Sequence, residues 1–227
     1  QQQQALTEKP KKYYAREEGE WRHNRTWISQ RSLDRTARRI AEEKARAEQI
    51  QRQKDEDEFI DMLWTMANYD DGPTAIRYPR GAGIGAKPKD KPVLLEIGKG
   101  EVLQDGNDIA VIALGHMYET ALETVQKLEA QGHSVALINP RFIKPLDAEL
   151  ITSYAEKCKV VITMEDHVLH NGFGASVIEL LSDRNIYTPV ERIGWPDEFI
   201  DHGKVEELRE KHGLTADHAV SKVTKHL

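Results

Sequence analysis

Asp108-Ile109-Ala110-Val111-Ile112-Ala113-Leu114 is the stretch that decides the fold of this chain. Its six consecutive apolar residues leave no polar face, so the strand they form has to be covered on both sides. Gly115 follows the run and leads into a helical pattern at 118–131, which Gly132 ends. A buried strand followed at once by a helix is the first half of a βαβ unit. The stretch therefore predicts the centre of a parallel sheet.

The same alternation continues to the end of the chain. Short β segments are expected at 93–102, and further strands at 134–138, 159–165 and 188–193. Helices are expected at 145–157, 174–182, 204–212 and 216–226, with Pro145 and Asp147 opening the first of them. We therefore predict an α/β domain at 93–227, with a mainly parallel sheet and helices on both faces.

Upstream of this domain, the pattern predicts one helix and one strand. A helix is expected at 57–68, with Phe59, Met62, Leu63 and Met66 on its buried face. Gly72 and Pro73 then make a turn before a β-prone run, Thr74 to Tyr78. Residues 54–81 form this part, and 82–92 is a glycine-, proline- and charge-rich linker to the domain.

Arg80 stands at the expected end of that strand. Pro79 cannot donate to a sheet ladder, so the strand should stop before Arg80, whose guanidinium follows a fixed backbone and precedes Gly81. Ligands bind outside the carboxyl ends of strands, and a planar donor fork suits a phosphate or carboxylate. The alternative is an arginine paired with a carboxylate at a domain junction. Arg77, inside the strand, is expected to form a structural pair.

Residues 1–53 differ from the rest in charge. They carry 13 Lys and Arg against 8 Asp and Glu, whereas the remainder carries 19 against 30. A solvated helix is expected at 32–53, within a basic extension that is helical or disordered. A nucleic-acid-binding arm that uses Trp21 and Trp27 is the alternative, but the eight acidic residues weigh against it.

Two further features bear on where the protein works. The only cysteine, Cys158, excludes an internal disulfide, fits a reducing compartment and is expected in the core. No apolar run approaches the roughly 18 residues that span a bilayer, and no secretory signal opens the chain. We expect a soluble intracellular protein without a membrane partner.

Six motifs occur in an order that resembles a known family. They are Ile76–Gly81, Ile97–Gly100, Pro140–Asp147, Thr163–His167, Asn171–Gly174 and Gly194–Ile200 with His202-Gly203. From about residue 54 onward the chain resembles the carboxyl-terminal part of the 1-deoxy-D-xylulose-5-phosphate synthase family, within the transketolase superfamily. Residues 54–81 would then be the last helix and strand of a pyrimidine-binding domain, and 93–227 a transketolase C-terminal-like domain.

This resemblance implies a reaction and partners. Pyruvate loses carbon dioxide, and its two-carbon remnant joins glyceraldehyde 3-phosphate, on thiamine diphosphate and magnesium held by a homodimer. Arg80 would bind the substrate phosphate, and the third domain would serve architecture and dimer packing. The implied location is the cytoplasm of a bacterium or the plastid stroma of a plant.

The sequence departs from that family in the cofactor motif. The closest string to its Gly-Asp-Gly diphosphate and magnesium motif is Asp105-Gly106-Asn107-Asp108, which lacks the leading glycine and reads as a strand-entry turn. The expected catalytic glutamate has no counterpart. We therefore expect a fragment that has no catalytic residue and no cofactor or metal site of its own. Such a fragment should be inactive alone. Whether the chain is an enzyme stays open at this point.

Other candidate residues cluster at the end of the strand expected at 159–165. Glu165, Asp166, His167 and His170 could bind a metal, although no fixed ligand set completes the sphere and the resemblance gives this loop no role. Gly172 and Gly174 could cradle a phosphate before a helix, but tight loop packing explains them better.

Two alternative functions stay open. One is the C-terminal domain of a 2-oxo-acid dehydrogenase β subunit, which shares this domain; the Arg-Tyr-Pro-Arg-Gly string favours the synthase. The other is a non-catalytic interaction module with a basic helical arm.

Overall fold

The computed structural model describes residues 58–78 and 91–227, all of which belong to one compact unit, Lys44–Leu227. The expected helix at 32–53, Arg80 and residues 82–90 of the expected linker at 82–92 lie outside the described residues.

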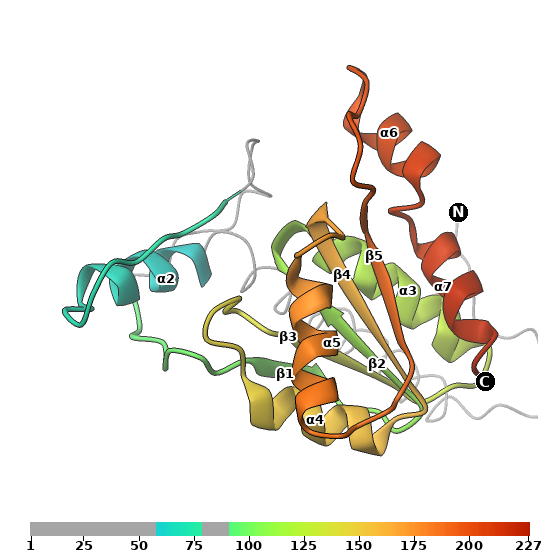
Figure 1. Cartoon of the computed structure of the whole chain (residues 1–227), viewed down its shortest axis with the longest axis horizontal. Coiled ribbons are helices and arrows are strands. Elements are labelled where there is room, and N and C mark those ends of the chain that lie inside the picture. The colour runs from blue at the N-terminus through green and yellow to red at the C-terminus, as the bar shows by residue number, and fades with distance from the viewer. Residues whose placement is uncertain (1–57, 79–90) are drawn as a thin grey trace, which may run out of the picture. The chain divides into compact units, whose positions relative to one another are not determined.

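A five-stranded sheet forms the centre of the unit, in the order β1-β3-β2-β4-β5 (Figure 1). The strands are β1 (Glu101–Gln104), β2 (Ile109–Ala113), β3 (Val135–Asn139), β4 (Val160–Val168) and β5 (Val190–Trp195). β2 is the middle strand, and all five of its residues are buried. Its neighbours β3 and β4 run parallel to it, and β5 runs parallel to β4. The predicted fold class is confirmed.

Helices cover both faces of this sheet. On one face α3 (Tyr118–Ala130) and α7 (Ala216–Thr224) pack against the side chains of Val111 and Ile162. On the other face α4 (Ala148–Lys157) and α5 (Phe173–Asp183) pack against Ile112 and Val161. A 3-10 turn, Gly115–Met117, joins β2 to α3, and α6 (Val205–His212) precedes α7. None of the described helices is long and apolar enough to cross a membrane.

The edge strand β1 differs from the expected β segments at 93–102. Residues 92–96 have no regular secondary structure, and the strand begins only at Glu101. It pairs antiparallel with β3, and its register shifts between Val102 and Gln104. The chain enters from outside the sheet, so the first residues after Pro92 have contacts with α2 (Glu58–Ala67) in place of a strand partner.

The buried face predicted for α2 is wrong. The buried residues of this helix are Asp61 and Thr65, whereas Leu63 is 38% exposed. The Asp61 carboxylate accepts the N–H of Val93 at 2.7 Å, and the Thr65 hydroxyl accepts the N–H of Leu95 at 2.9 Å. Polar side chains face the described chain because they satisfy backbone donors that have no strand partner.

The strand expected at Thr74 to Tyr78 is also absent from the described residues. The run is not assigned to any strand, and no backbone hydrogen bond joins it to another described residue. It lies beside α2, where the Phe59 and Tyr78 ring centroids are 5.2 Å apart. The β-prone composition is present, but the run pairs with neither edge strand of the described sheet, β1 or β5.

Candidate functional site

The carboxyl ends of β4 and β5 open into a pocket of about 550 Å³. Asp166 and His167 of β4 line one side, Trp195 of β5 lines another, and Arg77 reaches the pocket from the run after α2. This is the edge of a parallel sheet where ligands ordinarily bind. β4 is longer than expected because its pairing with β5 resumes at Val168 after an irregularity, which brings Asp166 and His167 into the strand.

Among the described residues, Arg77 makes one hydrogen bond at this edge. Its Nη2 donates to the carbonyl oxygen of Asp166 at 3.4 Å, and its side chain is otherwise exposed. The second arginine of the motif, Arg80, lies outside the described residues, so its predicted contact with a phosphate stays a prediction.

Asp166 fixes the floor of the pocket. Its carboxylate accepts the indole N–H of Trp195 at 2.6 Å and Nη2 of Arg209 at 3.2 Å. The His212 ring packs on Trp195 with centroids 5.7 Å apart, which holds α6 against the end of β5. Asp166 therefore joins three elements, and its two partners leave it little capacity to bind a metal.

Glu165 occupies the place where a phosphate was the alternative to tight loop packing at Gly172 and Gly174. Its buried carboxylate accepts the backbone N–H groups of Phe173 at 2.6 Å and Gly174 at 2.8 Å, at the start of α5. A Cβ at Gly172 would collide with this carboxylate, and one at Gly174 would lie 2.5 Å from Oγ1 of Thr163. The glycines are thus required for close packing around an internal anion, so an external phosphate has no room at this helix.

The two histidines do not join these acids in one site. Nδ1 of His167 lies 2.9 Å from the carbonyl oxygen of Val168, and the exposed His170 lies 3.9 Å from Asp197. Within residues 58–78 and 91–227, no group of three or more His, Cys, Asp or Glu side chains is arranged to hold a metal. The metal alternative finds no support in this part of the chain.

The turn Asp105 to Asp108 does not fit a diphosphate and magnesium group. Asp105 accepts the Tyr154 hydroxyl at 2.8 Å and pairs with Lys157 at 2.6 Å. Asp108 accepts the N–H of Ser134 at 2.9 Å and pairs with Lys159 at 2.9 Å. A Cβ on Gly106 would collide with the backbone of Val135 and Ala136, so the turn lies directly on β3. Its carboxylates serve the entry into β2, as the strand-entry interpretation predicts.

Cys158 lies in the core between α4 and β4, as expected. It is 6% exposed, and burial raises the pKa of its thiol to about 11. At neutral pH such a thiol stays protonated, which argues against a role as a nucleophile.

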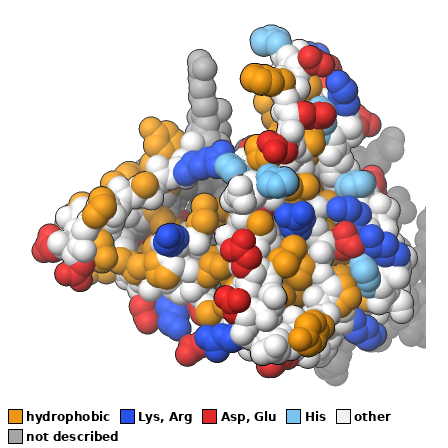
Figure 2. All heavy atoms as spheres, viewed as in Figure 1, with side chains coloured by type: hydrophobic (Ala, Val, Ile, Leu, Met, Phe, Trp, Pro, Cys, Tyr) orange, Lys and Arg blue, Asp and Glu red, His pale blue; other side chains and the backbone are white. Residues whose placement is uncertain are grey.

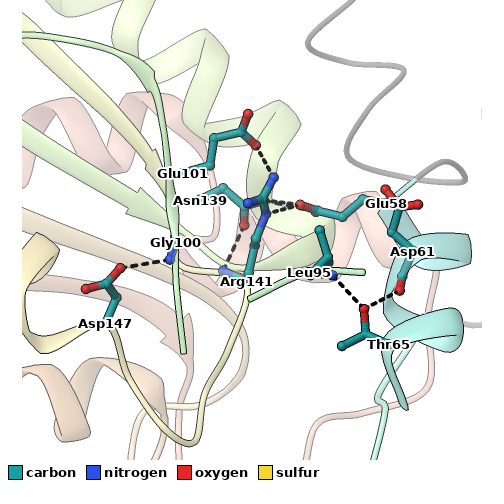
Figure 3. A network of polar contacts seen from close by, with 9 residues as sticks. All are labelled: Glu58, Asp61, Thr65, Leu95, Gly100, Glu101, Asn139, Arg141 and Asp147. Carbon is teal, nitrogen blue, oxygen red and sulfur yellow. Dashed lines mark hydrogen bonds and ion pairs between the residues drawn. The ribbon is translucent and has the colours of Figure 1, made fainter. Parts of the chain in front are cut away.

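One network was missed by reasoning from the sequence. Arg141 donates from Nε to Glu58 at 2.7 Å and from Nη2 to Glu101 at 2.7 Å, and the amide of Asn139 donates to both carboxylate oxygens of Glu58 (Figure 3). Arg141 has φ +55°, an unusual backbone conformation for a residue other than glycine. Its place in the Pro140–Asp147 motif was visible in the sequence, but Glu58 lies 83 residues away.

The fold and this site together define the class of protein. A family model described as "Transketolase, C-terminal domain" matches residues 98–219. The match covers more than half of the chain, and the chain therefore belongs to the transketolase C-terminal domain family.

Proteins with similar sequences point to one kind of enzyme within this family. The 1-deoxy-D-xylulose-5-phosphate synthase of Acidobacterium capsulatum is 49% identical over 173 residues, which are 76% of this chain and 27% of that protein. The synthase of Methylacidiphilum infernorum is 48% identical over 180 residues, 78% of this chain and 28% of that protein. The resemblance predicted from the motifs is confirmed, and the chain spans about a quarter of the length of these relatives.

A solved structure gives the same fold. It is described as "Split gene transketolase, inactive beta4 tetramer" and is 37% identical, with a TM-score of 0.56 over 60% of this chain and 44% of that chain.

Proposed function

We propose that this chain supplies the C-terminal part of a thiamine-diphosphate-dependent transferase of the 1-deoxy-D-xylulose-5-phosphate synthase type. The observation that carries the proposal is the 49% identity to such a synthase over 76% of the chain. The reaction condenses pyruvate with glyceraldehyde 3-phosphate and releases carbon dioxide, giving 1-deoxyxylulose 5-phosphate for isoprenoid precursors. The proposed location is the cytoplasm of a bacterium, or the plastid stroma if the chain comes from a plant.

In this proposal the C-terminal domain supports a site that other parts of the enzyme complete. The turn at Asp105 to Asp108 does not fit the cofactor, so thiamine diphosphate and magnesium bind elsewhere in the enzyme. Residues 54–81 end a pyrimidine-binding domain, 82–92 form the linker, and 93–227 serve architecture and dimer packing. The relative whose title names a split gene and a tetramer supports assembly from more than one chain.

The proposed contact with substrate is made by Arg80, which binds the phosphate of glyceraldehyde 3-phosphate. Arg77, three residues earlier, bonds to the carbonyl of Asp166 and lines the pocket at β4 and β5. The assignment of the phosphate contact to Arg80 rests on its place as the second arginine of the Arg-Tyr-Pro-Arg-Gly string at 77–81.

The test is kinetic and uses a chimaera. The matching stretch of the Acidobacterium capsulatum synthase is replaced by the aligned stretch of this chain, and Arg80→Ala is compared with Arg77→Ala. Loss of a charge-assisted phosphate contact should cost roughly 2–5 kcal/mol, so the KM for glyceraldehyde 3-phosphate should rise while that for pyruvate stays nearly constant. Arg80→Lys should rescue only partly, because an ammonium cannot form the bidentate fork. If Arg77→Ala produces this split instead, or both substrates weaken equally, the role of Arg80 is wrong.

A further inference from the structure

The segment 196–213 consists of the loop after β5 and helix α6. Figure 1 shows α6 beyond the carboxyl end of β5, where it covers neither face of the sheet. Within α6, Val205–His212, no residue is buried, whereas Ala216, Ala219 and Val223 of the next helix, α7, are buried. Figure 2 shows hydrophobic and charged side chains mixed on the surface of this projecting segment, at the top of the view. A helix with so little buried area belongs to the least stable part of a fold.

Contacts within the segment tie its loop to its helix. Nδ1 of His212 lies 3.7 Å from Oε1 of Glu198. A Cβ added at Gly203 would lie 3.3 Å from the side chain of Leu208, so the loop passes close to the inner side of α6. We therefore expect the loop and α6 to move together.

The two ends of the segment are fixed to the domain. Before it, the carbonyl oxygen of Trp195 accepts the N–H of Leu169 at 2.9 Å, at the end of the sheet. After it, Leu214 is only 2% exposed. Gly213 lies between α6 and this buried anchor with φ +76°, a backbone conformation that glycine adopts without strain. Such a residue at the end of an element is a suitable hinge.

Arg209 and His212 hold the segment on the pocket at β4 and β5. Nη2 of Arg209 donates to the carboxylate of Asp166 at 3.2 Å, and the ring of His212 packs on Trp195 with centroids 5.7 Å apart. The side chains of Arg209 and His212 are only 16% and 11% exposed. Both contacts join α6 directly to the residues that form the floor of the pocket.

These two side chains are incompletely satisfied in the closed arrangement. Nε of Arg209 and Nε2 of His212 are buried and have no hydrogen-bond partner among the described residues. A buried polar atom without a partner costs free energy, and water bonds to it once it is exposed. The pair of His170 with Asp197, at 3.9 Å, is exposed on both sides and adds little. Opening of the segment therefore regains hydration that offsets part of the contacts it loses.

We propose that residues 196–213 form a lid over the pocket at β4 and β5, which opens while the sheet stays folded. Ile200 and Leu208 line the pocket from the lid, and His167 and Trp195 line it from the sheet. An eight-residue helix is marginal on its own in water, so α6 loses its hydrogen bonds when the lid opens. The lid controls access to the pocket, and it does not depend on the proposed function.

The test compares local opening with global unfolding in the 227-residue chain. Hydrogen exchange measures the amides of α6 and β2, and diethyl pyrocarbonate measures access to the ring of His212, with mass spectrometry to resolve the nine histidines. We expect the α6 amides to exchange roughly 100-fold faster than the β2 amides, or more. Low concentrations of denaturant should accelerate exchange strongly in β2 and only weakly in α6, because opening of the lid exposes little surface.

Arg209→Ala should open the lid further. It removes the bond to Asp166, so the α6 amides should exchange and the His212 ring should react about tenfold faster, while the β2 amides keep their rate. Lys211→Ala is the matched control on the same helix. Lys211 pairs with Asp201 within the lid at 3.5 Å, with side chains 60% and 85% exposed, so its loss should change neither rate.

Three results would overturn the lid. If the α6 amides share the rate and the denaturant dependence of the β2 amides, the segment unfolds only with the core. If Arg209→Ala and Lys211→Ala have equal effects, the contact with Asp166 does not hold the lid closed. If the α6 amides exchange rapidly while the His212 ring stays unreactive, the pocket remains covered when the helix opens.

Discussion

Nε of Arg141 donates to the carboxylate of Glu58 at 2.7 Å and so joins α2 to the loop after β3, across 83 residues of sequence. The same guanidinium contacts Glu101 at the start of β1, and Glu58 also receives the amide of Asn139. The two side chains of the pair are only 22% and 13% exposed. Because the pair is shielded and charge-assisted, it fixes α2 more firmly than an exposed ion pair would.

The first prediction concerns this pair. Arg141→Ala should free α2 from the domain at a cost of about 2–3 kcal/mol, because it leaves the shielded Glu58 without a charged donor. Hydrogen exchange of the α2 amides is the measurement, and these amides should become faster while those of β2 stay slow. Lys204→Ala breaks a pair whose side chains are 79% and 67% exposed and should change neither. Equal acceleration in α2 and β2 would contradict a local role.

Glu165 gives the second prediction. Glu165→Ala should lower the free energy of unfolding by about 2–3 kcal/mol, because two buried N–H groups at the start of α5 lose a charged acceptor. Glu165→Gln retains one acceptor and should cost less. The denaturant midpoint measures both changes, with Glu156→Ala on the exposed face of α4 as the control. If Glu165→Ala and Glu156→Ala shift the midpoint equally, the carboxylate does not stabilise the helix.

The third prediction is a pH dependence from Glu191. Burial alone would raise the pKa of its carboxyl, but hydrogen bonds from His226 and Lys225 and the charge of Lys222 outweigh burial and lower the pKa to about 2. A group with a depressed folded pKa contributes its full stability above its ordinary value of 4.5 and loses it as the pH falls toward about 2. After allowance for solvent screening the contribution is about 1–2 kcal/mol.

The measurement is the free energy of unfolding of the wild type and Glu191→Gln between pH 6 and pH 2.5. The gap between the two proteins should be widest at pH 6 and should shrink through this window. If the difference in free energy of unfolding stays constant across this range, the ionisation of Glu191 is not linked to folding.

Cys158 provides the fourth prediction. With a thiol pKa of about 11, the folded protein should react with iodoacetamide at pH 8 roughly 100-fold more slowly than the unfolded chain. Because Cys158 is the only cysteine, the rate of labelling then reports unfolding of the core directly. Rapid labelling under conditions where circular dichroism shows a folded protein would contradict the burial of this thiol.

The fifth prediction is that the purified chain alone has no synthase activity. The reason is that the turn at Asp105 to Asp108 directs its carboxylates to Tyr154, Lys157, Ser134 and Lys159, so the cofactor finds no metal anchor there. The assay contains pyruvate, glyceraldehyde 3-phosphate, thiamine diphosphate and magnesium. Turnover above background in protein free of host enzyme sinks this prediction.

The central fold could be predicted because its signals are local. The apolar run at 109–113 admits only a strand covered on both faces, and Asp147 accepts the N–H of Leu150 as the cap of α4, as its place in the sequence indicates. The alternation of strands and helices then leaves few topologies for 93–227.

The wrong predictions for α2 and for the run 74–78 have one physical cause. Which face of a helix is buried, and whether an extended run pairs as a strand, depends on segments far away in the sequence. The spacing of Phe59, Met62 and Leu63 identifies the apolar side of α2 but not what lies against it. The composition of Thr74 to Tyr78 favours an extended backbone, yet a strand also needs an edge to pair with. Arg141, the partner of Glu58, lies 83 residues away, so no spacing rule could have found it, whereas the N–H groups that Glu165 accepts lie only eight and nine residues away.

The register shift between Val102 and Gln104 limits how the sheet can grow. A bulged strand of four residues offers too little regular backbone for another chain to join it edge to edge. Growth of the described sheet beyond β1 is therefore disfavoured. This edge is protected against edge-to-edge association with strands of other chains, although it is not covered by a helix.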